Sequence, residues 1–407
     1  MSLKIKKIEA REILDSKGKP TIEVELRTDF GKFLASVPSG VSTGKYEAVE
    51  LRDVDGGVKK AIEHIEKIIA PVLQKEDIKN QKKVDEILIH LDGTKNKSRL
   101  GANAILAVSI ATARAFSAIE NLSLWKLISK ISGQKPSLPK PCILLLEGGL
   151  HGRKELKFQE FMIFNNLSFV KEQLRINTEI YQALGKIINQ KYGNSNGRGL
   201  EGGFTPSINK VKDALDLIMI AIKKLGYEEK TKIVLDVAAS SFYKNGKYDF
   251  EDKKLNSEKL LEFYVDLFRN YPIFAIEDPF PEEDWNGFKE IKKRFGKRVI
   301  IIGDDLLVTN PERIKIAAEK DACSGLILKP NQIGTVSEAI EAANLAKSYD
   351  WKIMVSHRSG ETCDDFIADL AVGVTADFIK SGAPFPKERM AKYNRLLKIE
   401  EEWHSVS

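Results

Sequence analysis

The chain has 407 residues, 43% of them apolar and 30% charged, a composition typical of a folded protein with a full core. The net charge is only +6 and both signs are interleaved, so we expect neither a nucleic-acid nor a membrane partner. The cysteines are few and scattered, which argues against a disulfide framework or a zinc knuckle and favours a cytoplasmic location.

The first part of the chain predicts an α+β unit. Alternating residues indicate an antiparallel meander with strands at 21–26 and 33–37, and helical spacing follows at 58–73 (ending near Pro71), 81–90 and 102–119. The last of these reads as a buried Ala-rich helix, because polar residues interrupt it. A Pro- and Gly-rich linker spans Ser132–Pro141. We therefore predict an N-terminal α+β capping domain at 1–135 and a catalytic β/α barrel domain at 136–407.

Beyond the linker, short β-branched runs alternate with amphipathic helices, about 25–30 residues per repeat for most of them. Six successive runs end at an ionisable residue: Asp236, Glu277, Asp304, Lys329, His357 and Lys380. In a β/α barrel the carboxyl ends of the strands converge at one mouth, where active sites are found. The sequence therefore predicts three carboxylates and two or three cationic groups in one place.

Three carboxylates at close range would repel one another and raise each other's pKa values. A hard divalent cation removes this repulsion, and oxygen-only ligands point to Mg²⁺, Mn²⁺ or Ca²⁺ rather than zinc. A lysine beside such a site, Lys329, could have a lowered pKa and act as a base. This combination suggests removal of a proton next to a carboxylate, with the metal stabilising the enolate that forms.

Each residue alone has a simpler explanation. An Asp or Glu after a strand commonly caps the next helix, Lys329 alone would be a solvated lysine, and His357 alone would be a loop histidine with its hydrogen bonds satisfied. The functional interpretation depends on the series, because independent capping would not repeat strand after strand.

Motifs in the same order along nearly the whole chain resemble those of the enolase family. They lie at residues 14–21, 37–44, 91–106, 159–163, 303–306, 331–335, 356–362, 379–384 and 391–394. The run around His357 is the most specific of them. We interpret the chain as a divergent member of the family, with an archaeal-type enzyme as one interpretation.

The resemblance implies an N-terminal α+β domain followed by an enolase-type TIM-like barrel that begins with an antiparallel departure. It implies a lyase, phosphopyruvate hydratase, which dehydrates 2-phospho-D-glycerate to phosphoenolpyruvate in glycolysis and runs in reverse in gluconeogenesis. Two Mg²⁺ ions per active site are expected, and the partner is the small-molecule substrate. A homodimer or higher homo-oligomer is expected as well.

The resemblance also implies a role for each site residue. Asp236, Glu277 and Asp304 would hold the first Mg²⁺, and Ser42 would bind the second together with the phosphate. Lys329 would take the proton from C2, and Glu201 would protonate the leaving C3 hydroxyl. The remaining expected substrate or catalytic contacts are Glu160 and Gln159 on the acid side, Lys380 at the carboxylate, Arg358 and Ser359 at the phosphate, and His151 and His357 lining the pocket.

These roles require a neutral base and a protonated acid. We expect the metal ions and Lys380 to lower the pKa of Lys329, and neighbouring carboxylates to raise the pKa of Glu201.

Some positions depart from the family pattern: Glu147, Leu200, Ser241, Pro330 and Ser381. In the family an Asp normally stands at the position of Leu200 and an Asn at that of Glu147. None of these changes removes a residue with a direct chemical role, but the loss of the Asp beside Glu201 could weaken protonation. The alternatives are therefore a weakly active paralogue, another acid-sugar dehydratase of the superfamily, or a protein that keeps only the fold.

Overall fold

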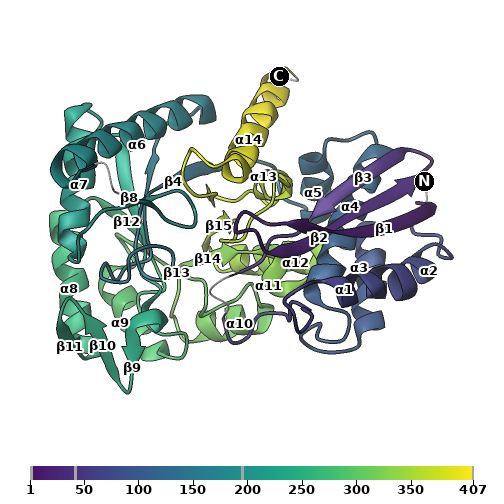
Figure 1. Ribbon diagram of the computed structural model, residues 1–407, viewed down its shortest axis with the longest axis horizontal. Coiled ribbons are helices and arrows are strands. Elements are labelled where there is room, and N and C mark those ends of the chain that lie inside the picture. Colours follow the sequence, from purple (N-terminus) through teal and green to yellow (C-terminus); the bar gives the residue numbers. More distant parts are fainter. Residues whose placement is uncertain (1–2, 41–43, 194–196, 406–407) are drawn as a thin grey trace.

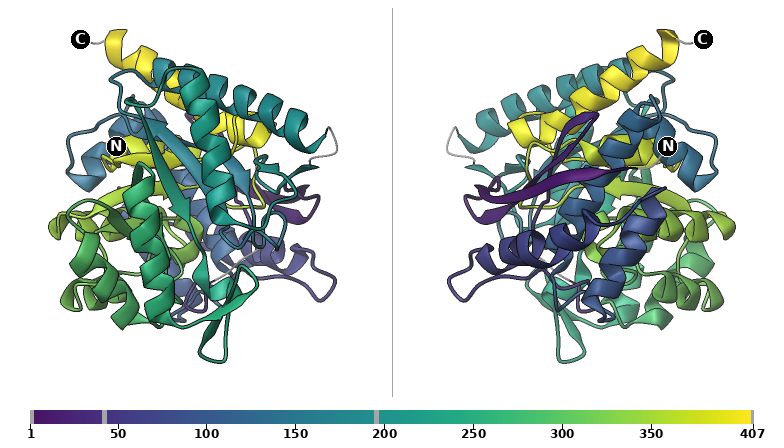
Figure 2. Two further views of the ribbon diagram at one scale, coloured as in Figure 1. Left: turned by 90° about the vertical axis from the view of Figure 1, so that its left-hand side faces the viewer. Right: turned by 90° about the vertical axis from the view of Figure 1, so that its right-hand side faces the viewer.

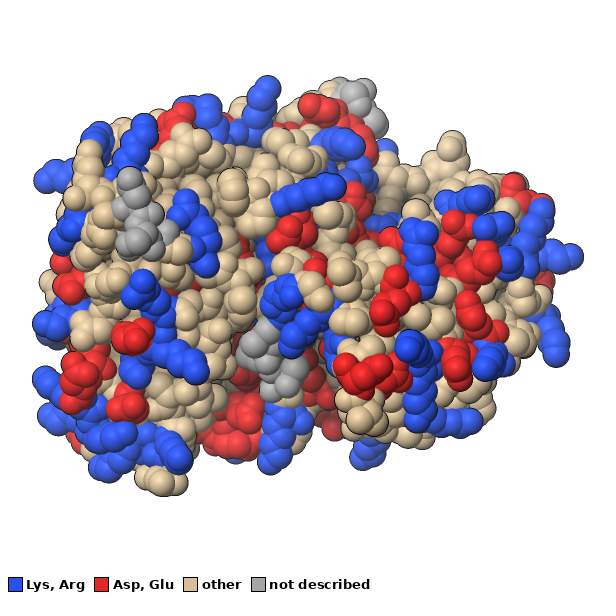
Figure 3. All heavy atoms as spheres, viewed as in Figure 1, with Lys and Arg blue, Asp and Glu red and all other residues tan. Residues whose placement is uncertain are grey.

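The computed structural model describes residues 3–40, 44–193 and 197–405. In Figure 1 a small sheet with helices lies at the N-terminal end, and a barrel ringed by helices forms the rest of the molecule. The fold class expected from the sequence, an α+β domain followed by a β/α barrel, is confirmed. On the face shown in Figure 3, Lys and Arg side chains are mixed with Asp and Glu.

The N-terminal sheet is an antiparallel meander of β1 (Ile5–Leu14), β2 (Pro20–Thr28) and β3 (Gly31–Ser36). Buried residues alternate along β2, as the period-2 pattern predicts, and this strand packs against α4. The helices that follow are α1 (Lys59–His64), the π-helical turn η1 (Ile65–Ile69), α2 (Ala70–Leu73), α3 (Gln81–Asp92), α4 (Ala102–Ile119) and α5 (Leu124–Ser132). Helical backbone continues without a break from α1 through η1 and α2 to Leu73, so the helix ends two residues after Pro71 rather than at it.

By length and composition alone α4 could cross a membrane, but 83% of it is buried inside the fold. Its buried residues occupy every side of the helix, which packs against β2, β3 and α3. This confirms the prediction of a buried Ala-rich helix.

Eight strands form the barrel, and the last pairs with the first to close it. In chain order they are β4 (Lys140–Glu147), β5 (Glu160–Asn165), β8 (Thr231–Asp236), β12 (Ile273–Glu277), β13 (Ile300–Gly303), β14 (Gly325–Leu328), β15 (Lys352–Ser356) and β16 (Phe378–Lys380). Strand β5 runs antiparallel to both of its neighbours, whereas the other adjacent pairs are parallel. The antiparallel departure expected from the resemblance is therefore present, and its position is β5.

Helices surround the barrel, and Figure 2 shows the C-terminal helix lying along α6. The helices are α6 (Val170–Tyr192), α7 (Val211–Lys224), α8 (Ser257–Asn270), α9 (Trp285–Phe295), α10 (Pro311–Glu319), α11 (Pro330–Ile333), α12 (Val336–Ser348), α13 (Phe366–Gly373) and α14 (Lys387–Ser405), with the 3-10 turn η2 (Ala239–Phe242). Short strands outside the barrel are β6 (Gly197–Arg198), β7 (Phe204–Thr205), β9 (Tyr243–Lys244), β10 (Lys247–Phe250) and β11 (Lys253–Leu255). Glu400 of α14 accepts hydrogen bonds from the first amides of α6, which ties the chain end to the barrel.

Candidate active site

A row of carboxylates crosses four adjacent strands at the mouth of the barrel. The strand pairings place Glu147 beside Glu160, Glu160 beside Asp236, and Asp236 beside Glu277. The reversal of β5 makes this row possible, because it brings the first residue of that strand to the same mouth as the last residues of β4, β8 and β12. All four carboxylates are buried.

The ammonium of Lys380, at the end of β16, lies among these carboxylates. Its Nζ is 2.7 Å from an oxygen of Glu277, 3.2 Å from Glu160 and 3.4 Å from Asp236. Burial disfavours the charged ammonium, but the carboxylates outweigh burial and raise the pKa of Lys380 well above its usual value. Lys380 therefore offsets part of the repulsion among these carboxylates.

Negative charge is still in excess along the row. Burial raises the pKa of Glu277 well above its usual value, and the neighbouring Asp236 adds to the shift. Burial also raises the pKa of Asp236 despite the nearby Lys380. A divalent cation fits such a site, because buried oxygen donors that carry uncompensated charge are the ligands that Mg²⁺ and Ca²⁺ prefer.

Asp304 and Lys329 follow the ends of β13 and β14 and form a close, largely buried ion pair. Burial disfavours the charged lysine, but Asp304 outweighs it, so the pKa of Lys329 is raised. This differs from our expectation of a lowered pKa. The reason is that the nearest charge to Lys329 is a carboxylate, whereas Arg358 and Lys380 have weaker effects.

A carboxylate that the sequence analysis did not identify binds the backbone at Asp304. Asp278 accepts hydrogen bonds from the backbone amides of Asp304 (2.9 Å) and Asp305 (2.7 Å). Ligand atoms of these three residues lie close enough together to share a metal ion. The position of Asp278 directly after the end of β12 is the signal that could have identified it.

On the opposite side of the mouth, Glu201 lies between two histidines. His357 Nε2 is 3.0 Å from Oε2 of Glu201, and His151 Nδ1 is 3.6 Å from Oε1. His151 also lies 3.6 Å from Glu160, so this histidine links Glu201 to the carboxylate row. Burial disfavours the charged carboxylate, but the two histidines and Arg389 outweigh burial and hold the pKa of Glu201 well below its usual value.

We had expected the pKa of Glu201 to be raised by neighbouring carboxylates, and the structure gives the opposite direction. Arg389 explains part of the difference, and sequence reasoning did not single it out. Its guanidinium is fully buried and lies 2.7 Å from Nδ1 of His357. No local pattern in the sequence distinguishes this arginine from others in the first turn of a helix.

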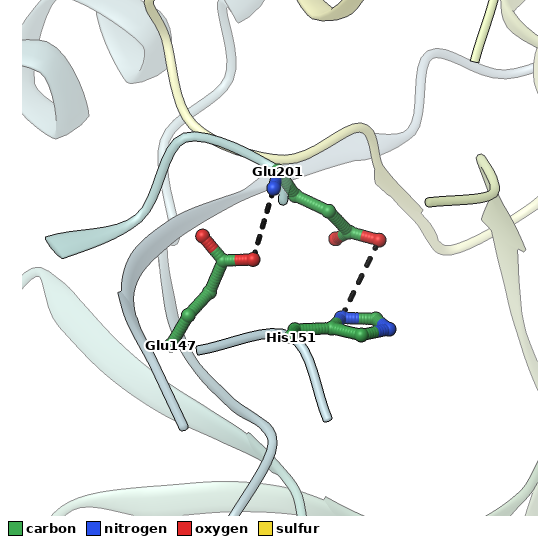
Figure 4. A group of neighbouring side chains, drawn as sticks. All are labelled: Glu147, His151 and Glu201. Carbon is green, nitrogen blue, oxygen red and sulfur yellow. Dashed lines mark hydrogen bonds and ion pairs between the residues drawn. The ribbon is translucent and has the colours of Figure 1, made fainter. Parts of the chain in front are cut away.

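The carboxylate of Glu147 contacts the backbone of the Glu201 loop rather than its side chain. Figure 4 shows Glu147, at the end of β4, pointing to the amide of Glu201, while the Glu201 side chain points toward His151. Burial, and then the charge of Glu201, raise the pKa of Glu147 well above its usual value. The sequence identified Glu147 only as a departure from the family pattern.

Arg358 lies at the edge of the mouth and pairs with a residue from the N-terminal part of the chain. Its two terminal nitrogens donate to the two oxygens of Glu47, at 2.8 and 3.2 Å. Ser359 is buried beside it, and its carbonyl accepts from Arg389. This arrangement joins the two parts of the fold at the mouth.

Ser42 lies outside the described residues. The segments on either side of 41–43 both contact the barrel: Ser39 forms a two-way backbone bridge with Gly360, and Gly44 packs against Val308 and Asp305. Gln159, the remaining expected contact, is buried and donates to Asp236 at 3.4 Å. The described residues predicted for the site therefore all lie at the barrel mouth.

Two family models match the chain. The one described as "Enolase, C-terminal TIM barrel domain" matches residues 135–407. The one described as "Enolase, N-terminal domain" matches residues 5–128. Together they account for both parts of the observed fold.

Proposed function

The chain belongs to the enolase family, and from this premise we propose that it dehydrates 2-phospho-D-glycerate to phosphoenolpyruvate and catalyses the reverse reaction. Family membership makes it a lyase-type enzyme of the enolase superfamily that acts on a small molecule with the help of a divalent metal ion. The observation that carries the specific proposal is the placement of a lysine amine and a glutamate carboxyl group at one barrel mouth. Lys329 follows the end of β14, and the buried Glu201 lies beside His357, which follows the end of β15.

In the proposed reaction the C2–H bond breaks and its proton passes to the amine of Lys329. The C3–O bond then breaks, a double bond forms between C2 and C3, and Glu201 gives its proton to the departing hydroxide, so that water leaves. This step requires the protonated form of Glu201, which His357, His151 and Arg389 disfavour in the structure. Lys380 lies near the substrate carboxylate, on which negative charge develops after proton removal. His151 and His357 orient Glu201, and Glu160 with Gln159 supports that side.

We propose that Asp236, Glu277 and Asp304 hold one Mg²⁺, and that Ser42 contributes to a second one with the substrate phosphate. When bound, these ions would supply positive charge that stabilises the doubly negative substrate carboxylate. Asp304 pairs with Lys329 in the structure, and any cation that engages Asp304 would weaken this pair and favour the neutral amine that a base requires.

Arg358 and Ser359 are the proposed phosphate contacts. The planar guanidinium of an arginine can donate two parallel hydrogen bonds to a phosphate. In the structure Arg358 donates two such hydrogen bonds to the carboxylate of Glu47. The flanks of residues 41–43 lie on the same edge of the mouth, which supports a phosphate and metal contact by Ser42.

The test is conversion of 2-phosphoglycerate to phosphoenolpyruvate by purified protein, followed by absorbance with Mg²⁺ present and then chelated. We expect metal-dependent turnover that falls by at least about 10²-fold in Lys329→Ala and in Glu201→Gln. Absence of turnover in folded, Mg²⁺-saturated protein would contradict the proposal. Turnover of an unphosphorylated hydroxy acid instead would identify another dehydratase of the superfamily.

We further propose the domain boundary near residue 135, a cytoplasmic location, and a homodimer or larger homo-oligomer. The boundary is supported by the absence of helix and strand between the end of α5 at Ser132 and the start of β4 at Lys140. Light scattering on purified protein would measure the assembly, and a monomeric mass would contradict an oligomer.

A further inference from the structure

The loop Gly199–Gly203 carries the proposed acid and has no unpaired backbone group. Two of its amides bind carbonyls of the loop itself, since Gly199 donates to Gly203 and Gly202 donates to Gly199. The amide of Leu200 donates to the carbonyl of His151. The carbonyls of residues 200, 201 and 202 accept from Arg389, Ala383 and Tyr181, respectively.

The two remaining amides both bind one side chain, that of Glu147. Its Oε1 accepts from the amide of Glu201 at 2.9 Å, and its Oε2 accepts from the amide of Gly203 at 2.6 Å. The Glu147 carboxylate is fully buried, and buried amides need an acceptor from within the fold. The backbone on both sides of the acid is therefore anchored to the end of β4.

The glycines of the loop fit closely around this carboxylate. A Cβ atom at Gly199 would lie 2.4 Å from Oε2 of Glu147, and one at Gly203 would lie 2.9 Å from its Cγ. These glycines allow the loop backbone to approach the carboxylate, which a larger residue would prevent. The small loop residues and the Glu147 carboxylate are therefore both needed for this close contact.

We propose that Glu147 is the positioning residue of the acid, whose carboxylate fixes the loop so that the Glu201 side chain stays between His151 and His357. This inference rests on the proposed function, since it assigns Glu147 to the protonation step. Glu147, His151 and Glu201 also lie close enough together to share a cation. Both oxygens of Glu147 already accept from amides, however, which favours positioning over metal binding.

The experiment separates the two halves of the reaction. Exchange of the C2 proton of 2-phosphoglycerate with D2O, measured by NMR, requires the base but not the acid, whereas release of phosphoenolpyruvate requires both. We expect Glu147→Gln to lower kcat for dehydration by about 100-fold while C2 exchange and KM stay near wild type. The glutamine keeps the shape of the side chain but offers only one acceptor oxygen for the two amides.

Asp85→Asn is the matched control, because Asp85 is another fully buried carboxylate that accepts a backbone amide but lies outside the site. It should leave the ratio of exchange to dehydration unchanged. If Glu147→Gln does not fold, as judged by Tm, Glu147→Asp provides the same comparison, because it keeps the charge but shortens the side chain.

An unchanged ratio in the Glu147 variant, or an equal loss of exchange and dehydration, would overturn the positioning role. Wild-type protein that neither exchanges nor dehydrates 2-phosphoglycerate would instead overturn the proposed function. The two failures are therefore distinguishable.

Discussion

The ammonium of Lys380 lies within ion-pair distance of three buried carboxylates, and each of the four groups is nearly inaccessible to water. Taking charges out of water costs free energy that only close opposite charges offset. Removal of Lys380 would leave these three carboxylates without their nearest cation. This arrangement is useful for binding metal and substrate, and it makes one lysine unusually important for stability.

We expect Lys380→Met, a change that keeps the volume, to lower the free energy of unfolding by about 3–5 kcal/mol at neutral pH without divalent ions. Denaturant unfolding with a chelator present would measure it. Lys130→Met is the control, since Lys130 pairs with Glu120 at the exposed surface and such pairs contribute at most about 1 kcal/mol. Equal effects of the two substitutions would contradict this reading.

The strand-end positions of the site residues could be predicted from the sequence, but the protonation behaviour of the acid and base could not. Each β-branched run shows where a strand ends, whereas a pKa depends on partners that come from other strands and loops. Lys329 meets Asp304, and Glu201 meets two histidines and a buried arginine. Glu147 meets a loop 54 positions away, for which no local pattern exists.

At the scale of elements, hydrophobic spacing predicted the meander and three helices of the N-terminal part and six of the barrel strands, but neither β4 and β5 nor the direction of β5. Every residue of β5 is buried, so the pattern of buried residues does not indicate whether the strand runs parallel or antiparallel to its neighbours. The resemblance to a family supplied the antiparallel departure. In the structure this departure places Glu160 at the mouth, whereas a parallel β5 would place that residue at the opposite end of the barrel.

Helix α3 is tied to α12 and α4 by one buried carboxylate. Asp85 accepts hydrogen bonds from the amide of Ser337 and the hydroxyl of Ser109. Burial raises the pKa of Asp85 from its usual 3.8 to about 6, although these hydrogen bonds oppose the shift.

We expect the contribution of Asp85 to stability to fall as the carboxylate ionises, because the charge is then buried away from water. Because the pKa is higher in the folded chain than in the unfolded chain, the folded protein binds more protons between about pH 4 and 6. The free energy of unfolding contributed by Asp85 should therefore fall by about 3 kcal/mol as pH rises through this window, and stay level above it. The difference in unfolding free energy between wild type and Asp85→Asn, measured from pH 4 to 7, tests this. A difference that is constant or rises with pH would contradict it.

At the scale of the whole molecule, Arg114 joins the N-terminal part to the barrel. Its terminal nitrogens donate to the two oxygens of Asp364 at 2.7 and 2.8 Å, and one of them also donates to the carbonyl of Leu34. Asp364 in turn accepts from the amide of Ser36 at the end of β3. One ion pair thus connects α4, the N-terminal sheet and the segment before α13.

We expect Arg114→Met to lower the free energy of unfolding by about 3 kcal/mol, because it leaves a largely buried Asp364 without its cation. Chemical denaturation would measure the loss. The matched control is Arg175→Met, whose ion pair with Glu179 is exposed on α6, and its denaturation midpoint should stay unchanged. A loss no larger in Arg114→Met than in the control would show that the contact does not hold the two parts together.

Closure of the barrel by β16 against β4 also constrains the order of events during protein synthesis. The first barrel strand leaves the ribosome more than 200 residues before its neighbour β16, which carries Lys380. Since domains generally fold as units, the row of carboxylates can gather only when the lysine that neutralises it has also emerged. A nascent chain that stops short of Lys380 would therefore lack the site altogether, rather than carry a weakened form of it.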